Sequence, residues 1–315
     1  MTAQLVSIIT PAYNAGRFIG EAIASAQAQT HRDWEMIIVD DGSTDNTIEI
    51  VRAACSVEPR IRLIRFPRNT GLAAAARNAA MRRARGTFFA FLDADDLWLP
   101  TKLEEQLRIF EAHPTTAVIC TWYDVFGDEE RARLWRQMLW RFETPHVSLD
   151  QVLQQSLTTP TVMMHRRCFE ELGGFTVSRR LTTGEDSEYW IRLVARYEVR
   201  RVCKPLVRVR VHAQGHSLSV ANVAQKRERD RELHRHVLAG GALSPAQQRA
   251  YTAIFHYNSA RDSLFHLHRP FRGDLYRSVA TFRAPSKALI MAALSFLPAP
   301  ILRRTLKALL KIKQG

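Results

Sequence analysis

Short apolar runs alternate with helix-like stretches between residues 5 and 92 of this 315-residue chain. The runs occupy residues 5–10, 34–39, 61–64 and 88–92, and apolar side chains recur at helical spacing between them. Runs that are apolar throughout predict strands buried on both faces, as in parallel sheets. Because such strands alternate with helices, the sequence predicts an α/β fold with a mostly parallel sheet flanked by helices.

Carboxylates follow two of these runs directly. Asp40 and Asp41 come after residues 34–39, and Asp93 and Asp95 come after residues 88–92. Open α/β sheets bind ligands at the carboxyl ends of their strands. Two carboxylates separated by one residue can hold a hard divalent cation, and that cation could neutralise a diphosphate. An Asp-x-Asp pair is also a common helix cap, so the pair alone predicts little.

Five ordered motifs resemble those of the family 2 glycosyltransferases of the GT-A fold, which is Rossmann-like. The resemblance covers residues 4–220 and implies a glycosyltransferase of EC class 2.4, of the bacterial surface-polysaccharide type, that uses a nucleotide-sugar donor. The motifs are residues 7–14 (SIITPAYN), 39–45 (VDDGSTD), 71–78 (GLAAAARN), 92–96 (LDADD) and 173–190 (GGF through GEDSEYW).

The resemblance implies that Pro11, Tyr13, Asp41, Arg77 and Asp93 bind the nucleotide sugar. Tyr13 would pack on the base, and Asp41 would accept a hydrogen bond from the base imide. Arg77 and Asp93 would contact the diphosphate or the ribose. The alternatives are a loop aromatic that covers the core for Tyr13 and a solvated side chain for Arg77. We favour function for Arg77, because its helix is predicted to be buried and an unpaired buried arginine is costly.

The same resemblance implies that Asp95 coordinates a divalent metal, Mn²⁺ or Mg²⁺. His212, which follows an alternating strand pattern at residues 207–211, resembles a second ligand. A histidine at a strand end can equally be structural or merely exposed. Asp96 is assigned to the following turn, and for Asp40 and Asp45 a capping role remains open beside ligand contact.

Glu185 and Asp186 precede an amphipathic helix. By resemblance, Asp186 is the general base of an inverting transfer, and Glu185 holds it or contacts the acceptor. Acids at this position also complement the helix dipole, and the two roles are compatible. No Ser/His/Asp or Cys/His pattern that would indicate a covalent nucleophile is apparent in the sequence.

Other chemistries lack their sequence signatures. No Gly-x-Gly-x-x-Gly follows the first strand, and no P-loop motif is present. Cys55, Cys120, Cys168 and Cys203 are dispersed and make no metal or redox motif. With an N-terminus that runs directly into a strand, the expected compartment is the reducing cytoplasm.

The C-terminal part of the chain carries none of the five motifs, and its sequence pattern predicts helices. We expect residues 1–220 to form the transferase domain and residues 221–315 to form a helical region. Residues 301–313 set apolar side chains at helical spacing beside cations, which predicts an interfacial helix on anionic lipid at the inner face of the cell membrane. The alternative is a helix packed on its own domain. Residues 288–297 are apolar but too short to span a bilayer.

The formal net charge of +14 permits two interpretations. A nucleic-acid-binding protein would concentrate that charge in a basic patch, but no nucleic-acid motif is present and the arginines are spread along the chain. The charge also suits a nucleotide-diphosphate donor and a polyprenyl-diphosphate acceptor. We place residues 122–142, an insert rich in tryptophan and arginine, over the acceptor side as a lid or a membrane-proximal element.

The hypothesis is a metal-dependent inverting glycosyltransferase that moves a sugar, with a UDP sugar as the expected donor, to a glycan or a lipid-linked glycan. Its first alternative is a non-catalytic nucleotide-sugar-binding scaffold of the same fold. The retained Asp41, Asp93, Asp95 and Asp186 argue against that alternative. Its second alternative is the basic nucleic-acid-binding protein.

Overall fold

The computed structural model describes residues 4–138, 142–181, 184–213 and 223–262. The chain forms two compact units, residues 1–220 and residues 221–315. The predicted site motifs all lie in the first unit. The division of function predicted at the same boundary stays a prediction.

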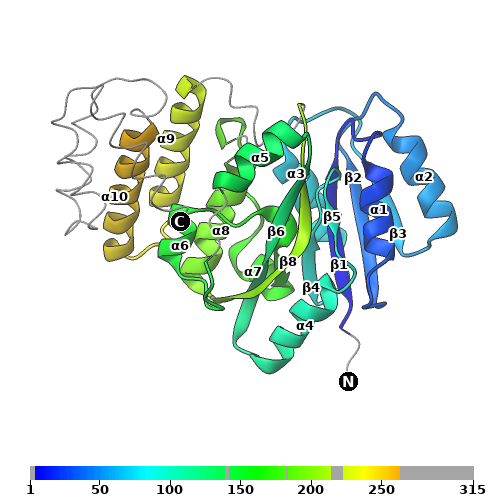
Figure 1. The fold of residues 1–315 in the computed structure, drawn as a ribbon, viewed down its shortest axis with the longest axis horizontal. Helices are drawn as coiled ribbons and strands as arrows, with labels where there is room; N and C mark the ends of the chain where they lie inside the picture. The colour runs from blue at the N-terminus through cyan, green and yellow to red at the C-terminus, as the bar shows by residue number, and fades with distance from the viewer. Residues whose placement is uncertain (1–3, 139–141, 182–183, 214–222, 263–315) are drawn as a thin grey trace. The chain divides into compact units, whose positions relative to one another are not determined.

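A single sheet organises the first unit (Figure 1). Within the described residues it has eight strands in the order β3-β2-β1-β4-β7-β6-β8-β5. The first four in this order run parallel, β7 is antiparallel to both of its neighbours, β6 and β8 are parallel, and β5 is antiparallel to β8. The strands are β1 (Val6–Ala12), β2 (Trp34–Asp40), β3 (Ile61–Arg65), β4 (Phe88–Phe91), β5 (Leu97–Trp98), β6 (Thr116–Gly127), β7 (Met163–His165) and β8 (Glu198–Val211).

Helices flank this sheet, and the predicted α/β class is confirmed. The α-helices of the first unit are α1 (Ile19–Gln27), α2 (Thr47–Val57), α3 (Ala73–Arg83), α4 (Lys102–Ala112), α5 (Glu129–Met138), α6 (Leu149–Gln154), α7 (Arg166–Leu172) and α8 (Glu185–Arg196). Two short 3₁₀ turns, η1 (Thr159–Thr161) and η2 (Arg179–Leu181), lie between them in the chain.

The parallel strands form because their apolar runs are buried on both faces. Every residue of β2 is buried, and so is every residue of β4. Ile8 of β1 lies opposite Met36 of β2 and Ala90 of β4, and all three side chains are fully enclosed. Burying a side chain of the size of isoleucine or methionine contributes roughly 1.5–3 kcal/mol.

The register aligns the carboxyl ends of three strands. Ala12 at the end of β1 pairs with Asp40 at the end of β2, and Ile9 of β1 pairs with Phe91 at the end of β4. The residues that follow these strands therefore meet at one edge of the sheet, where the predicted site residues stand.

The expectation for residues 122–142 is wrong in one respect. Residues 122–142 are not a separate insert, because residues 122–127 continue strand β6 and pair with β8 as far as Gly127 and Val211. Figure 1 shows β6 and β8 as two long neighbouring strands, and α5 follows β6 directly. The long ladder with β8 makes residues 122–127 part of the sheet, which the tryptophan and arginine content of the segment did not indicate.

The second unit contains α9 (Val223–Ala239) and α10 (Pro245–Asp262). Helix α10 begins at Pro245, directly after Ser244. Ser244 N donates to Gln247 Oε1 at 2.8 Å, and Gln247 N donates to Ser244 Oγ at 3.3 Å. Residues 288–297 and 301–313 lie outside the described residues. Among the helices that the structure describes, none is both long and apolar enough to cross a membrane.

Candidate active site

Asp41, which is predicted to bind the nucleotide sugar, lies at the aligned strand ends. It is 5% exposed. Its Oδ1 accepts from Thr70 N at 2.9 Å, and its Oδ2 accepts from Thr70 Oγ1 at 2.9 Å and from Gly71 N at 3.2 Å. A carboxylate has about four acceptor positions, so these bonds leave about one for a ligand.

Gly42 lets this loop approach the turn before Thr70. Its φ is +75°, and a Cβ at this position would lie 2.6 Å from Asn69 N. A side chain would therefore push the two segments apart.

The loop after β1 presents Tyr13 to solvent, with the residue 46% exposed. Pro11, which is also predicted to bind the nucleotide sugar, lies near the end of β1 and pairs with Val39 of β2. Asn14 fixes the loop, because its N donates to Ser43 Oγ at 2.9 Å and its Oδ1 accepts from Thr44 N at 2.8 Å. A ring held this far out of the core does not cover it, which disfavours the structural alternative for Tyr13.

Asp40 and Asp45 serve the loop rather than the site edge. Asp40 accepts from Ser43 N, with the shorter distance 3.2 Å to Oδ2. Asp45 accepts from Gly16 N at 2.9 Å and from Thr47 N at 3.0 Å. These are hydrogen bonds within the loop, and the cap residue of α2 is Asn46, which forms no side-chain cap hydrogen bond.

Arg77 on α3 joins the donor side to the acceptor side. It is 6% exposed, so the alternative of a solvated arginine is wrong. Its Nη2 donates to Asp93 Oδ1 at 2.8 Å, and its Nη1 donates to Glu185 Oε1 at 3.4 Å. Burial works to lower the pKa of Arg77, but the charges of Asp93 and Glu185 outweigh it and the pKa is raised. Within the described residues, Arg77 Nε has no hydrogen-bond partner.

Asp95 and His212 meet although 117 residues separate them in sequence. His212 Nε2 lies 3.0 Å from Asp95 Oδ2, and the imidazole packs on Phe18 with ring centroids 4.7 Å apart. Strand β8 brings the histidine here, because Arg210 Nε donates to Asp95 O at 2.9 Å. The two predicted metal ligands are therefore brought together.

The pair fits a divalent ion that shares its coordination with a substrate. Among the described residues, no group of three or more His, Cys, Asp or Glu side chains could hold a metal alone. Mg²⁺ is commonly bound through one or two carboxylates, with substrate phosphates and water completing the sphere. An oxygen and a nitrogen ligand facing each other at the diphosphate side meet this requirement.

Asp96 lies beneath this pair. Its N donates to Asp93 O at 3.1 Å, which closes the turn expected here, and its Oδ1 accepts from Arg210 N at 2.7 Å. Burial, followed by the charges of Asp95 and Asp93, raises the pKa of Asp96 well above its ordinary value. The sequence placed Asp96 in the motif of residues 92–96 and Arg210 in the strand pattern before His212, but it did not predict that the two residues pair.

Glu185 and Asp186 begin helix α8. Asp186 Oδ2 accepts from Thr159 Oγ1 at 3.3 Å, and Asp186 Oδ1 accepts from Ser187 N at 2.6 Å. Burial raises the pKa of both carboxyls, and for Asp186 the positive charge of Arg77 opposes that rise. Glu185 Oε2 is buried and has no hydrogen-bond partner in the described part of the chain. Thr159 stands in the unpatterned turn η1, so nothing in the sequence marked it.

Asn78 locks the acceptor-side motif against α3. Its Nδ2 donates to Phe175 O at 2.8 Å, and its Oδ1 accepts from Phe175 N at 2.9 Å. A Cβ on Gly174 would collide with Asn78 Oδ1. This contact explains why the segment at residues 173–175 and the start of α8 reach Arg77.

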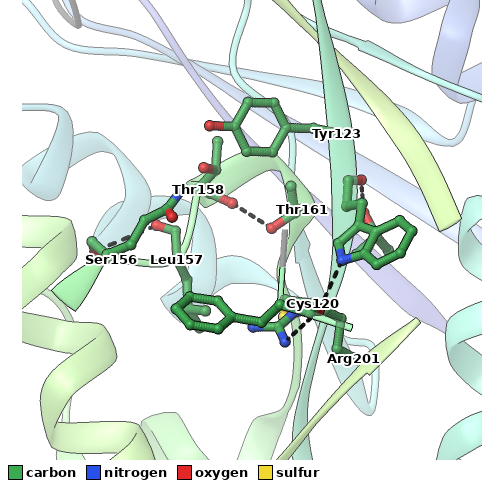
Figure 2. A pocket seen from close by; sticks show the side chains of 11 residues that line it. Cys120, Tyr123, Ser156, Leu157, Thr158, Thr161 and Arg201 are labelled. Carbon is green, nitrogen blue, oxygen red and sulfur yellow. Dashed lines mark hydrogen bonds between the residues drawn. The ribbon is translucent and has the colours of Figure 1, made fainter. Parts of the chain in front are cut away.

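A pocket of about 50 Å³ lies next to η1 (Figure 2). Thr158 of its wall is adjacent in sequence to the Asp186 partner Thr159. Figure 2 shows Cys120 and Arg201 at one end of the view and Tyr123 at the other. The wall includes Cys120, Tyr123, Phe142, Gln155, Thr158 and Arg201.

Sequence relatives of this chain carry glycosyltransferase names. Over 125 residues the chain is 44% identical to the putative teichuronic acid biosynthesis glycosyltransferase TuaG of Bacillus subtilis, which covers 40% of this chain and 49% of TuaG. Over 110 residues it is 44% identical to the UDP-Glc:alpha-D-GlcNAc-diphosphoundecaprenol beta-1,3-glucosyltransferase WfgD of Escherichia coli, covering 35% of this chain and 42% of WfgD. The aligned regions thus span less than half of these relatives.

Solved structures share the fold over nearly the whole chain. TarS 1–349 of S. aureus in complex with UDP-GlcNAc superposes with a TM-score of 0.65 at 17% identity, covering 95% of this chain and 86% of that chain. The mannosyltransferase PcManGT of Pyrobaculum calidifontis in complex with GDP-Man and Mn²⁺ superposes with a TM-score of 0.59 at 22% identity, covering 97% and 80%. These likenesses confirm the GT-A fold.

The family itself is identified by its sequence model. Residues 7–173, more than half of the chain, match the model of glycosyl transferase family 2. That segment includes the strand ends, the Asp-x-Asp motif and Arg77. The chain belongs to glycosyl transferase family 2.

Proposed function

We infer that this enzyme transfers a sugar from a UDP sugar to an acceptor hydroxyl with inversion at the anomeric carbon, assisted by a divalent metal. One observation carries the proposal: Arg77 joins Asp93 on the donor side to Glu185, the neighbour of Asp186. Arg77 Nε and Glu185 Oε2 lack hydrogen-bond partners among the described residues. Buried polar atoms without partners are rare, and here they suit a site completed by substrate.

On the donor side, Tyr13 packs on the base and Asp41 accepts a hydrogen bond from its imide. Pro11 lines the same edge, and Asp93 and Arg77 contact the ribose and diphosphate. The exposed ring of Tyr13 and the remaining acceptor position of Asp41 support these roles. The name of WfgD, which includes UDP-Glc, and the UDP-GlcNAc bound to TarS support uridine as the base.

Asp95 and His212 hold Mn²⁺ or Mg²⁺ between them. The bound ion supplies Lewis-acid stabilisation for the charge that develops on the departing diphosphate. Arg77 contributes a fixed positive charge on the same side. The 3.0 Å approach of Asp95 to His212 supports the assignment, and so does the Mn²⁺ complex of PcManGT.

Asp186 takes the proton of the acceptor hydroxyl as that oxygen attacks the face opposite the diphosphate. A base positioned in this way typically contributes about 10²–10⁴-fold in rate. The raised pKa of Asp186 makes it a stronger base than an exposed aspartate. Glu185 holds Arg77 in place and faces the acceptor. The acceptor is a glycan or a polyprenyl-linked glycan, in line with the diphosphoundecaprenol acceptor in the name of WfgD.

The donor role is tested by thermal unfolding of the purified protein with a panel of nucleotide sugars, with Mn²⁺ and then with EDTA. A donor at ~100 times its dissociation constant raises the free energy of unfolding by about 2.7 kcal/mol. We expect stabilisation by UDP sugars that EDTA removes. Salt-dependent binding of duplex DNA without any donor shift would instead favour the nucleic-acid alternative.

The catalytic role is tested with Asp186→Asn. This variant keeps the size of the side chain and loses the base, so we expect at least about a 100-fold fall in kcat with donor binding retained. Ser56→Ala, on the exposed side of α2, is the control. Turnover unchanged in Asp186→Asn would remove this residue from the mechanism, and absence of turnover in the unmodified protein would favour the scaffold alternative.

A further inference from the structure

Arg201 on β8 is a buried cation without a carboxylate partner. It is 8% exposed, and within the described residues no aspartate or glutamate forms a salt bridge with it. Its Nη1 donates to two backbone oxygens, Phe142 O at 3.2 Å and Thr144 O at 3.1 Å. Its other contacts among the described residues are with the thiol of Cys120 and with the ring of Phe142, whose centroid lies 5.6 Å from the guanidinium carbon, and neither group is a carboxylate.

Two other arginines of this unit that have little exposure, Arg77 and Arg192, do have carboxylate partners. Arg77 contacts Asp93 at 2.8 Å, and Arg192 contacts Glu188 at 2.6 Å. Enclosing a cation without its counter-charge is expensive, which is why buried charges are normally paired. The missing counter-charge of Arg201 therefore suggests an anion that arrives with a ligand.

Arg201 lines the pocket next to η1, and no acidic side chain is among the described residues of its wall. The pocket wall also includes neutral hydrogen-bonding groups, among them Tyr123, Gln155 and Thr158. The volume of about 50 Å³ holds roughly four water-sized groups. That space suits a carboxylate or a phosphate rather than a whole sugar ring.

The pocket is also next to the proposed base. Residues 155–158 and Thr161 contribute to its wall, and Thr159 in the same segment donates to Asp186. A group held by Arg201 would therefore belong to the molecule whose hydroxyl approaches Asp186. That molecule is the acceptor.

We propose that this pocket binds an anionic substituent of the acceptor, a carboxylate or a phosphate, through the guanidinium of Arg201. The inference rests on the proposed function, since it names the acceptor class of that same site. Planar oxyanions match the fork of a guanidinium and form charge-assisted hydrogen bonds with it. The enzyme would then prefer an acceptor that carries negative charge near the hydroxyl that attacks.

The test uses three acceptors that share one sugar and one octyl chain: the neutral glycoside, the corresponding uronide and the glycosyl diphosphate. Transfer from the UDP sugar selected in the ligand panel gives kcat/KM for each acceptor. The readout is the ratio of anionic to neutral acceptor within each variant, so that a general loss of activity cancels. Each anionic acceptor gives one ratio of its kcat/KM to that of the neutral glycoside. A larger ratio for the uronide indicates that the pocket binds a carboxylate, and a larger ratio for the glycosyl diphosphate indicates that it binds a phosphate.

We expect a ratio of at least about tenfold in the unmodified protein, about one in Arg201→Gln, and an intermediate value in Arg201→Lys. Arg200→Gln is the matched control, because the neighbouring Arg200 pairs with Glu198 at 2.7 Å and is not part of the pocket wall. Its ratio should equal that of the unmodified protein.

Because Arg201 also holds the 142–144 segment through two carbonyls, Arg201→Gln can lose stability. Ser156→Asp leaves those bonds in place and supplies a carboxylate from the pocket wall, so it should also bring the ratio towards one. A ratio near one in the unmodified protein, or an unchanged ratio in Ser156→Asp and in folded Arg201→Gln, overturns the inference while leaving the proposed function intact. A protein that neither hydrolyses the donor nor transfers its sugar would overturn both.

Discussion

The guanidinium of Arg77 connects two parts of the site that are remote in sequence. Asp93 is 16 residues away and Glu185 is 108 residues away, and both contact it directly. Replacing the arginine with an apolar side chain would leave two carboxylates next to a third, Asp186, without a counter-charge. Charge balance at this residue therefore controls the protonation of the base as well as the affinity for a diphosphate.

Substituting Thr159 should change the pKa of Asp186. Its Oγ1 donates to Asp186 Oδ2 at 3.3 Å, and this bond lowers the pKa of a carboxyl that burial raises. In Thr159→Val the charged form loses a donor, so the pKa should rise further. Since the base works only when deprotonated, the acid limb of the pH profile of kcat/KM should move to higher pH.

The measurement is kcat/KM across pH 4–9, at saturating metal. Thr116→Val is the matched control, because Thr116 is similarly buried and its side chain acts on Glu198 instead of on Asp186. An acid limb at the same pH in Thr159→Val and in the control would mean that another group limits the rate at low pH.

At the element scale, strand pairing brings the site together, and a buried carboxylate holds the opposite end of the same strands. Glu35 at the start of β2 is 1% exposed. It accepts from Ser7 Oγ at 2.7 Å and from Arg85 N at 2.5 Å, and it contacts Arg62 Nη2 at 2.7 Å. Three segments that enter or flank β1, β3 and β4 are thus tied to β2 away from the ligand edge.

Glu35 should make the stability of this unit depend on pH. Burial acts to raise its pKa, but the hydrogen bonds from Arg85 and Ser7 and the charge of Arg62 prevail, and the pKa is lowered. A lowered pKa stabilises the fold above the unfolded value of about 4.3, and that contribution is lost as the pH falls through the folded value.

Glu35→Gln keeps the shape of the side chain and removes its charge. We expect the free energy of unfolding at pH 7 to fall by roughly 1–3 kcal/mol, with the difference from the unmodified protein shrinking below about pH 4. Urea unfolding at several pH values measures this. Glu49→Gln, at an exposed position of α2, is the control. A difference that stays constant down to pH 3 would contradict the assignment.

At the scale of the whole molecule, the sequence predicted the sheet and the strand ends better than the acceptor side. The parallel strands are apolar runs separated by helical spacing, and the carboxylates after them belong to short motifs. Thr159 and Arg201 act through tertiary contacts that no local motif marked. Arg210 lies in the alternating pattern of residues 207–211, but that pattern does not reveal its bond to Asp96. The length of β6 was missed because its pairing partner, β8, lies far along the chain.

The basic C-terminal residues give the last prediction at this scale. From residue 271 onward the sequence has nine Lys or Arg and one acidic residue, and five of these cations lie within residues 301–313. Each cation close to an anionic bilayer contributes about 1 kcal/mol, and the attraction weakens as salt screens it. The full chain should therefore sediment with vesicles that contain phosphatidylglycerol and much less with neutral phosphatidylcholine vesicles.

Deleting residues 301–315 should lower the fraction bound to the anionic vesicles by at least about tenfold, and 0.5 M salt should do the same for the full chain. The matched control keeps the length and the apolar residues but replaces Arg303, Arg304, Lys307, Lys311 and Lys313 with glutamine. If charge drives the binding, the control should behave like the deletion. Equal binding of all three proteins would assign these residues to packing within the protein, because a helix buried against its own unit has no cations available to lipid.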